Sequence, residues 1–378
     1  MKKIKLVEAC LKIGSGATPR GGKNVYCEKG ISLIRSQNVL DFDFSENGLV
    51  YINEGQASKL NNVEVMAGDV LLNITGDSVA RATIMKSDFL PARVNQHVAI
   101  IRAKKEIISP LYLLYFLQYQ KSYLLQLASA GATRNALTKS MIAGIELELP
   151  SLDIQRKIVS ILNDIQEKIL ENKKINENLE QQVSILYQSW FEDFKITNGV
   201  CPEDWSYQEL SSIADIASGK RPPVKSNVCN QETPISIVGA ASVMGFTSEA
   251  NHTDKILVTG RVGTHGVVQR FNTPCWTSDN TLVITSPYYE FTNQILHRID
   301  YSSMNRGSTQ PLITQGDMKK VVVLVPDENT LAKFEEFAGS LMVKWEANNK
   351  ENVKLASLRD TLLPKLMSGE FDVSDIDL

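Results

Sequence analysis

Apolar residues recur at every third or fourth position along two long stretches of the chain. The first stretch begins after Pro150 and continues for about 40 residues, which as one helix would form a rod of roughly 60 Å. Proline breaks a helix interior, so we expect this helix to begin at about Ser151, whose hydroxyl suits the N-cap. The second stretch follows Pro326 in the same way, and Pro364 and Gly369 are expected to end it.

The two predicted helices belong to an internal repeat. Residues 131–150 and 307–326 align at a constant offset of 176 positions, and each segment ends in an alternating strand that is followed by proline. Earlier segments also correspond once the offset is shifted: residues 10–19 resemble 213–222, residues 31–39 resemble 235–243, and residues 95–101 resemble 279–285. The chain is therefore predicted to be a tandem duplication.

Each half of the duplication opens with a module of short alternating strands. Gly, Pro, Asn and Asp separate these strands, which predicts a β-rich module with a few helices. One such helix is expected over residues 109–130, whose aromatic side chains suit a core better than a ligand site. The predicted fold class is α+β, with two β-rich mixed modules in tandem and a long α-helix after each.

Polar residues interrupt both apolar stripes at matching places. Asn172 and Asn176 lie in the first, and the offset of 176 positions puts Asn348 and Asn352 at the equivalent points of the second. A polar side chain in an apolar seam can fix the register of two helices at a cost in stability. The alternative, that these asparagines are solvated positions on a frayed stripe, stays equally open. The residues expected to pack between the helices or against partners are Gln155, Ile158, Ile165, Asn172, Asn176, Leu179, Leu341, Trp345, Asn348, Asn352, Leu355 and Leu362.

Charge is distributed unevenly along the chain. The net charge of −3 taken alone argues against a nucleic-acid partner, because phosphates attract clustered Lys and Arg. Residues 151–194 and 327–378 carry −3 and −5, which leaves +5 on the rest. The modules are thus mildly basic, and the objection to nucleic acid weakens.

The cysteines and the hydropathy bear on the cellular compartment. Five cysteines without a CxxC pair and four separated histidines argue against structural zinc and fit a reducing compartment. No window approaches the ~18 apolar residues of a membrane span, and the first residues lack an apolar signal region. We therefore expect a soluble, cytoplasmic protein.

Motifs for catalysis are missing from the sequence. The glycine-rich residues 13–24 fail the P-loop pattern, because Ala17 and Asn24 occupy the required Gly and Ser/Thr positions. No Asp-Pro-Pro-aromatic or Asn-Pro-Pro-aromatic stretch for base methylation occurs. His265 has no nucleophile motif and no ordered third partner. We expect no catalytic residue, no metal ligand and no cofactor on this chain.

Polar loops bordered by glycine occur at matching places in both halves. Arg, Lys, Asn and Gln suit the bidentate reading of guanine and adenine edges, and Thr hydroxyls suit phosphates. Loops in general contain such residues, so surface solvation is the competing interpretation for each one. The candidates for contact with DNA are Thr18, Arg20, Lys23, Arg35, Gln37, Asn38, Arg81, Arg134, Asn135, Lys220, Arg221, Lys225, Arg261, Thr264, Asn305, Arg306, Thr309 and Gln310.

Three segments resemble the DNA-specificity subunit of type I restriction-modification systems. LPSLDIQRKIV, from Leu149, and LRDTLLPKLMSGEF, from Leu358, resemble the conserved regions of that family. WSYQELSSIADIASGKRP, from Trp205, is similar to the usual opening of its target-recognition domains. The resemblance covers essentially the whole chain, in the order variable module, conserved helix, variable module, conserved helix.

The resemblance implies a non-catalytic subunit. Two target-recognition domains would each read one half of a bipartite site in double-stranded DNA, and the helices would pair as an antiparallel coiled coil with pseudo-two-fold symmetry. The implied partners are two copies of the modification methyltransferase subunit and a restriction/translocase subunit. S-adenosylmethionine, ATP and Mg are expected only in those partners. One departure is Leu331, which stands where the first helix has Gln155, so a role of that glutamine does not carry over.

Four domains follow from the repeat and the resemblance. They are target-recognition domain 1 at 1–150, spacer helix 1 at 151–198, target-recognition domain 2 at 199–326, and spacer helix 2 with the C-terminal tail at 327–378. Two alternatives stay open: a coiled-coil scaffold that reads no DNA sequence, and a fused DNA methyltransferase or nuclease. Salt-sensitive binding of duplex DNA argues against the first, and S-adenosylmethionine binding by the chain alone would support the second.

Overall fold

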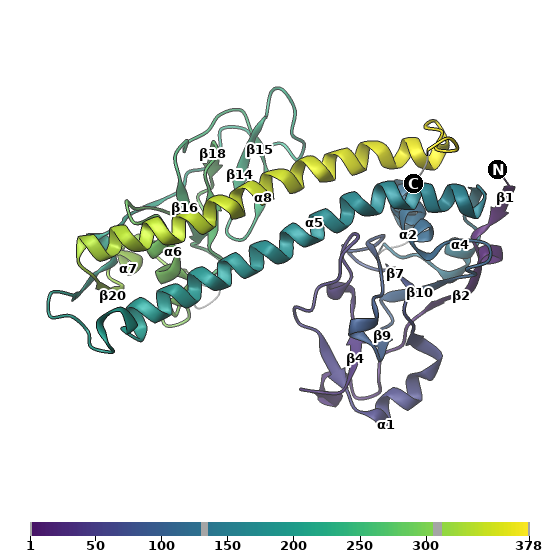
Figure 1. Ribbon diagram of the computed structural model, residues 1–378, viewed down its shortest axis with the longest axis horizontal. Coiled ribbons are helices and arrows are strands. Elements are labelled where there is room, and N and C mark those ends of the chain that lie inside the picture. Colours follow the sequence, from purple (N-terminus) through teal and green to yellow (C-terminus); the bar gives the residue numbers. More distant parts are fainter. Residues whose placement is uncertain (1, 130–134, 305–311, 377–378) are drawn as a thin grey trace. The chain divides into compact units, whose positions relative to one another are not determined.

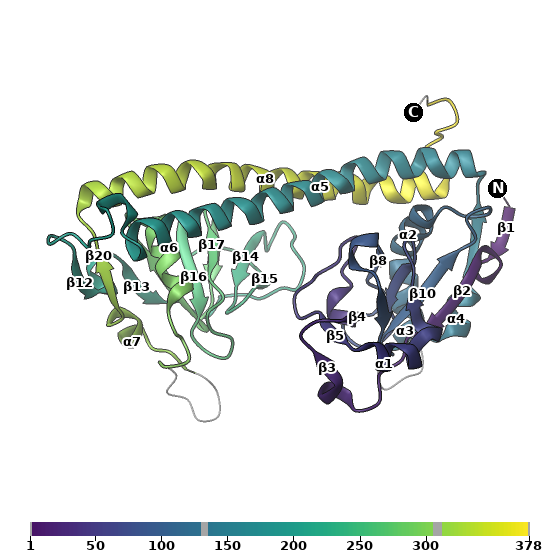
Figure 2. The same ribbon diagram turned by 60° about the horizontal axis from the view of Figure 1, so that its bottom comes forward.

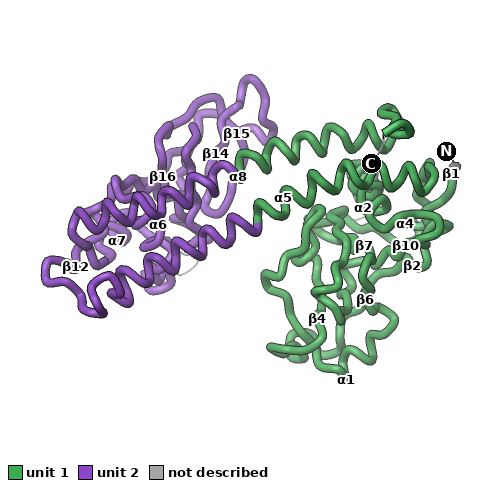
Figure 3. Tube along the Cα trace, viewed as in Figure 1, with its two compact units in different colours: residues 1–173, 349–378 green, residues 174–348 purple. Residues whose placement is uncertain are grey.

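The computed structural model describes residues 2–129, 135–304 and 312–376 and contains two compact units (Figure 1, Figure 3). Unit 1 comprises residues 1–173 and 349–378, and unit 2 comprises residues 174–348. The two long helices, α5 (Leu152–Tyr187) and α8 (Glu328–Ser368), each contribute one part to each unit.

The described residues of unit 1 form three sheets. Their strands are β1 (Lys2–Lys5), β2 (Cys10–Ser15), β3 (Tyr26–Cys27), β4 (Ile31–Ile34), β5 (Val50–Ile52), β6 (Glu64–Val65), β7 (Val70–Asn73), β8 (Ala82–Ile84), β9 (Ala92–Val94), β10 (Val98–Ala103) and β11 (Glu146–Leu149). The short helices are α1 (Glu54–Ala57), α2 (Pro110–Tyr119), α3 (Lys121–Ser129) and α4 (Lys139–Ala143). The sheet orders are β2-β10-β7-β8, β3-β5-β4-β9-β6 and β1-β11.

Unit 2 repeats this arrangement with fewer strands among its described residues. Its strands are β12 (Ser206–Glu209), β13 (Asp215–Ser218), β14 (Ile235–Val238), β15 (Val243–Thr247), β16 (Ile256–Gly260), β17 (Gln269–Phe271), β18 (Cys275–Thr277), β19 (Thr281–Thr285) and β20 (Val322–Val325). Its short helices are α6 (Tyr289–Arg298) and α7 (Gln315–Lys319). The sheet orders are β13-β19-β16-β17, β15-β14-β18 and β12-β20. The view in Figure 2 shows both sets of strands.

Each strand of unit 2 has a counterpart in unit 1, whereas β3 and β6 of unit 1 have none among the described residues of unit 2. The four-stranded sheets correspond in order, and the parallel pair β4–β9 recurs as the parallel pair β14–β18. The two-stranded pairs β1–β11 and β12–β20 are both antiparallel. The predicted α+β organisation, with two mixed modules in tandem and a long helix after each, is therefore confirmed.

Each module packs its core against parts of both long helices. In unit 1, Ile158 and Leu162 of α5 join Leu363 and Leu366 of α8 in the main apolar cluster. In unit 2 the corresponding cluster includes Tyr187 of α5 together with Leu331 and Phe334 of α8. Burial of these side chains is the main stabilising contribution within each unit.

The repeated threonines and prolines have local roles. Thr138 and Thr314, which match at the offset of 176, are the N-caps of α4 and α7, and each side chain accepts a hydrogen bond from the backbone N–H three residues later. Ser151 accepts from the N–H of Ile154, as its predicted N-cap role requires, at 3.4 Å. The chain thus begins α5 directly after the proline that closes β11.

Two helix boundaries differ from the prediction. The helix expected over residues 109–130 is two helices, α2 and α3, which separate at Gln120, and Ala130 lies outside the described residues. Pro364 does not end α8, which continues to Ser368 before Gly369 adopts a φ of +76°. Burial of the neighbouring core side chains compensates for the hydrogen bond that proline removes. Over the described part of the chain, no helix has the length and apolar character needed to cross a membrane.

Candidate nucleic-acid interface

In unit 1, several loops meet at one end of the four-stranded sheet. β2 and β7 end there, and β10 and β8 begin there, because the register pairs Ser15 with Ala99 and Asn73 with Val98. The N–H of Leu137 donates to the carbonyl of Ile74 at 2.8 Å, which brings a further loop to the same place. Most of the unit 1 candidates for DNA contact lie on these loops, although they are far apart in the sequence.

Gly16 allows two of these loops to touch. Its N–H donates to the carbonyl of Val98 at 2.8 Å, and the N–H of Ala17 donates to that of Val94 at 3.0 Å. A Cβ atom at Gly16 would lie 2.2 Å from the carbonyl oxygens of Val94 and Asn95, a distance that side-chain atoms do not tolerate. The glycine therefore fixes how the loop that carries Thr18 crosses the segment before β10.

The candidates at this end of the sheet differ in exposure. Thr18, Arg20, Lys23 and Asn135 are exposed, and Arg81 is half-buried. No other described residue forms a hydrogen bond or an ion pair with the guanidinium of Arg81. These side chains can reach a bound phosphate or base edge without losing an internal contact.

The RSQN segment that follows β4 is engaged within the protein. Asn38 is fully buried and donates to the carbonyls of Ser45 and Asn47 at 2.9 and 3.2 Å. Its amide is therefore not presented at the surface, and we remove it from the candidates. Gln37 is exposed but donates to the carbonyl of Gly48 at 3.3 Å, and half-buried Arg35 donates to the same carbonyl.

Unit 2 builds the same sheet end. Gly219 donates to the carbonyl of Thr281 at 3.1 Å, and Lys220 donates to that of Thr277 at 2.9 Å, as Gly16 and Ala17 do in unit 1. A Cβ at Gly219 would lie 2.1 Å from the carbonyl oxygen of Ser278. The Arg261 N–H donates to the carbonyl of Asn280 at 2.8 Å, so the loop after β16 lies beside the others.

The candidates of unit 2 lie on these equivalent loops. Lys220, Arg221, Lys225 and Thr264 are exposed. Arg261 is half-buried, and its Nε has no partner among the described residues. The remaining candidates, Arg134 in unit 1 and Asn305, Arg306, Thr309 and Gln310 in unit 2, lie outside the described residues.

The basic side chains at this sheet end affect the pKa of a neighbouring histidine, His252. Burial lowers the pKa of His252 from its usual range, and the cation of Lys220 adds to that effect. His252 is therefore predominantly neutral at pH 7, and the local positive charge comes from lysine and arginine.

The loop before β10 was missing from the candidates. Gln96 is exposed, and its neighbour His97 forms a hydrogen bond through Nδ1 with the hydroxyl of Thr75 at 2.6 Å. The internal repeat could have indicated this loop, because the sequence comparison matched residues 95–101 with 279–285. The strand register shows that this match was wrong by one residue, since Val98 corresponds to Thr281. A slip of one residue exchanges the two faces of a strand.

Four asparagines join the two long helices. In unit 1, Asn172 donates to the side-chain oxygen of Asn352 at 3.0 Å. In unit 2, Asn348 donates to that of Asn176 at 2.8 Å. Asn172, Asn176 and Asn348 are buried, so the alternative of solvated positions is wrong.

The other predicted stripe residues are inside the helix pair or at its margin. Ile158 and Leu179 are buried, and Trp345 donates from Nε1 to Glu180 at 2.8 Å. The half-buried members of the stripe are Ile165, Leu341, Trp345, Leu355 and Leu362. In both units the contacts run in opposite directions along α5 and α8, so the helices are antiparallel.

Gln155 connects α5 to the module of unit 1. Its side chain is fully buried, accepts from the N–H of Ser109 at 2.9 Å, and donates to the carbonyls of Ile107 and Pro150 at 3.1 and 3.0 Å. It therefore fixes the start of α2 and the end of β11 on the long helix.

Unit 2 makes the corresponding connection one helical turn later. Leu331, the counterpart of Gln155, is buried in the apolar cluster, and Glu335 accepts from the N–H groups of Glu290 and Phe291 at 3.1 and 2.8 Å. Burial raises the pKa of Glu335 to about 7. Sequence comparison missed this replacement, because position 335 corresponds to Val159 and not to Gln155.

The chemistry of these sites is that of binding. Within residues 2–129, 135–304 and 312–376, no group of three or more His, Cys, Asp or Glu side chains could hold a metal ion. Lysine and arginine at the sheet ends offer charge to phosphates, and the amides and guanidinium groups offer donors to base edges.

Comparisons with known proteins agree with this geometry. The model of the family described as type I restriction modification DNA specificity domain matches twice, at residues 22–181 and 202–339. The MjaIX type I restriction enzyme specificity subunit of Methanocaldococcus jannaschii is 24% identical over 99% of this chain and 94% of its own. The HindI specificity subunit of Haemophilus influenzae is 21% identical over 84% of this chain and 88% of its own.

A solved structure shares the fold. The S subunit of a type I restriction-modification system from M. genitalium aligns with a TM-score of 0.55 at 16% identity and covers 97% of this chain and 96% of its own. The two family matches fall on the two halves of the duplication and together span most of the sequence. This chain therefore belongs to the family of type I restriction modification DNA specificity domains.

Proposed function

We propose that this chain is the specificity subunit of a type I restriction-modification complex and that each unit reads one half of a bipartite DNA site with the loop end of its four-stranded sheet. The observation that carries the proposal is the equivalence of the two ends. Gly16 and Gly219 allow equivalent loops to cross equivalent neighbouring segments in the two units, and basic side chains follow both glycines. A duplicated binding surface fits a divided DNA site.

Different side chains at each end have different tasks. Exposed Arg20, Lys23 and Lys220 contact phosphates and contribute affinity that depends on salt. Half-buried Arg81 and Arg261 have less freedom, which suits a directed contact with a base edge. Sequence-specific binding requires both kinds of contact.

The long helices set the distance between the half-sites. An antiparallel coiled coil of α5 and α8 acts as the spacer, and half-sites about one helical turn apart, ~34 Å, place both contacts on one side of the duplex. The same helices dock two copies of the modification methyltransferase subunit, and a restriction/translocase subunit completes the complex in the cytoplasm. S-adenosylmethionine, ATP and Mg bind only to those partner subunits, and the specificity subunit is non-catalytic.

Removing charge from one sheet end tests the proposal. The variant Arg20→Ala with Lys23→Ala loses two exposed cations beside Gly16. The matched control, Lys5→Ala with Lys105→Ala, loses two exposed cations away from this sheet end, one in β1 and one that follows β10. Binding of each variant to duplex DNA is measured as a function of salt, with the modification subunits present.

We expect the affinity of the sheet-end variant to depend less on salt. If both cations contact phosphates, the slope of log affinity against log salt falls by about 1.8, and the control keeps the slope of the unmodified chain. Equal slopes for the two variants would exclude this sheet end as the DNA-binding surface.

A further inference from the structure

An unpaired strand edge borders a groove in unit 2. β20 pairs with β12 only, and the register sets Val322 opposite Glu209 and Leu324 opposite Tyr207. The carbonyl of Val321 accepts from the N–H of Leu210 at 2.7 Å, on the β12 side. Backbone groups of successive residues point to opposite edges of a strand, so Val322 and Leu324 direct their N–H and C=O groups away from β12.

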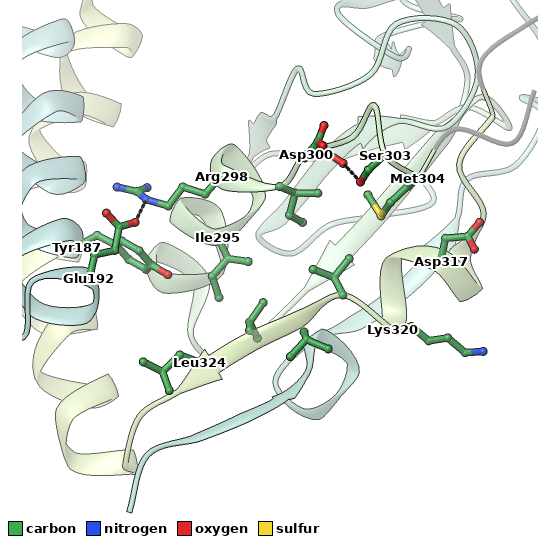
Figure 4. A pocket seen from close by; sticks show the side chains of 14 residues that line it. Tyr187, Glu192, Ile295, Arg298, Asp300, Ser303, Met304, Asp317, Lys320 and Leu324 are labelled. Atoms are coloured by element: carbon green, nitrogen blue, oxygen red, sulfur yellow. Dashed lines mark hydrogen bonds and ion pairs between the residues drawn. The ribbon is translucent and has the colours of Figure 1, made fainter. Parts of the chain in front are cut away.

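These outward backbone groups face a groove of about 780 Å³. Residues 321–324 form one wall, and the opposite wall includes Arg298 at the end of α6 and the segment from Ile299 to Met304 (Figure 4). No other described residue hydrogen-bonds to the backbone of Val322 or Leu324. The groove therefore offers two donors and two acceptors at the spacing of a strand.

The side chains on this pair of strands are unusual for an exposed surface. Tyr207 is 74% exposed and Val322 is 63% exposed, and both lie on the outer face of the pair. Solvent-exposed edge strands normally carry charge, which prevents unwanted strand pairing. Exposed Glu209 lies on the same face, opposite Val322, and is its acidic member. Exposed apolar side chains beside an unpaired edge indicate a surface that another chain covers.

Unit 1 shows the protected form of the same pair. Glu146 and Glu148 of β11 are the counterparts of Val322 and Leu324, and Lys3 of β1 is the counterpart of Tyr207. Lys3 forms an ion pair with Glu146 at 2.8 Å. The duplication therefore retains a charged edge strand, β11, in unit 1 and an apolar edge strand, β20, in unit 2, so a partner of this surface would bind once per chain.

The charge of the groove limits the partner further. Hydrogen bonds from Ser302 hold the pKa of Asp300 below its usual range, so this exposed carboxylate is ionised at neutral pH. Exposed Lys320 lines the same groove, but no cation in the described part of the chain forms an ion pair with Asp300. An incoming segment with a basic side chain would supply that cation.

We propose that the edge of β20 binds an extended segment of a partner protein, which adds to the β12–β20 pair as a third strand. Its backbone pairs with Val322 and Leu324, its apolar side chains cover the outer face, and a basic side chain reaches Asp300. This inference does not depend on DNA recognition.

Peptide binding to the full chain tests the proposal. The probe is a fluorescent seven-residue peptide of alternating valine and lysine, and its control is the same peptide with N-methylated backbone amides. Val322→Pro removes an outward N–H and spares the ladder with β12, and Glu146→Pro is the matched change in unit 1. A second variant, Val322→Glu with Leu324→Glu, copies the charged edge of unit 1 and guards against misfolding by proline.

We expect one peptide per chain, at least tenfold weaker binding by both β20 variants, unchanged binding by Glu146→Pro, and weaker binding of the N-methylated peptide. Anisotropy gives the affinities, and thermal melts confirm that each variant folds. Absence of saturable binding, equal affinity of the variants, or two peptides per chain overturns the proposal. It is also overturned if the chain self-associates and Val322→Pro makes it monomeric, because the edge would then serve a second copy.

Discussion

The side-chain oxygen of Asn176 accepts a hydrogen bond from the amide of Asn348 at 2.8 Å, which joins α5 to α8 within unit 2. The offset of 176 makes Asn348 the counterpart of Asn172, and Asn352 the counterpart of Asn176. The bond between Asn172 and Asn352 in unit 1 is therefore the same contact with the helices exchanged. Two-fold interfaces have this reciprocal pattern, so the duplication in sequence recurs in the contacts of the helix pair.

The asparagine pair of unit 2 predicts a non-additive effect on stability. Asn176→Leu leaves the buried amide of Asn348 without this partner and should lower the free energy of unfolding by about 1–3 kcal/mol. Asn348→Leu in the same chain should recover most of that loss, since both polar groups are then gone. Because all four tryptophans lie in unit 2, urea unfolding followed by their fluorescence measures the effect.

The double variant should also lose its single register. Size-exclusion chromatography with light scattering should reveal misaligned or oligomeric species, since only the Asn172–Asn352 pair of unit 1 then selects an alignment. A monodisperse double variant whose two single effects simply add would show that the asparagines do not specify register.

Gly16 and Gly14 provide a matched pair in one segment. Gly16→Ala should cost about 1–3 kcal/mol, because its Cβ meets backbone oxygens at 2.2 Å. Gly14→Ala should be nearly neutral, because nothing lies within 4 Å of a Cβ at that position. Thermal unfolding compares the two, and similar melting temperatures would contradict the close approach of the loops.

Glu335 predicts a pH dependence that its replacement removes. Its pKa is about 7 in the folded chain against 4.5 as the ordinary value. Between these values the folded state binds a proton that the unfolded state does not, so the free energy of unfolding falls as pH rises through that window. The free energy of unfolding of Glu335→Gln, relative to that of the unmodified chain at the same pH, should rise by about 1–3 kcal/mol from pH 5 to pH 8.

Urea titrations at several pH values, followed by tryptophan fluorescence, measure this difference. Burial lowers the pKa of His297, whose titration acts in the opposite direction, so each variant is compared with the unmodified chain at the same pH. Parallel stability profiles for the two chains would mean that Glu335 titrates as an exposed glutamate does.

The sequence predicted the features that depend on local rules. Pro150 and Pro326 marked the beginnings of the long helices, because proline is disfavoured in helix interiors, although α8 contains Pro364. The matched Asn172 and Asn176 indicated where polar groups enter the helix seam. Alternating strands and the offset of 176 predicted two similar modules, which the sheet orders confirm.

Features that depend on tertiary contacts were not predictable. Nothing local distinguishes buried Asn38, whose partners lie in a later loop, from the exposed Gln37 beside it. Glu335 reads as an ordinary helix-surface glutamate, and only the packing of α6 buries it. The one-residue error at β19 arose because both registers place apolar residues in alternation, and only strand pairing decides between them.

Lengthening both helices together tests the spacer role. Four residues inserted after Lys174 and four after Lys350 add about 6 Å to each helix. Both insertions fall between the Asn172–Asn352 pair and the Asn176–Asn348 pair, so the two partners of each pair stay opposite one another. We expect the gap between recognised half-sites to change by about one or two base pairs, whereas insertion in α5 alone should disrupt the register. Methylated-base mapping reads the gap, and an unchanged gap in the double insertion would show that the helices do not set it.

The central claim is that each unit reads one half of the DNA site, and module exchange tests it most directly. Residues 1–150 are replaced by the corresponding module of another family member, the chimera is expressed with its modification subunits, and methylated bases are mapped across the host genome. Our account predicts that one half of the bipartite motif changes and that the other half and the gap remain. A motif that changes in both halves, or in neither, would contradict it.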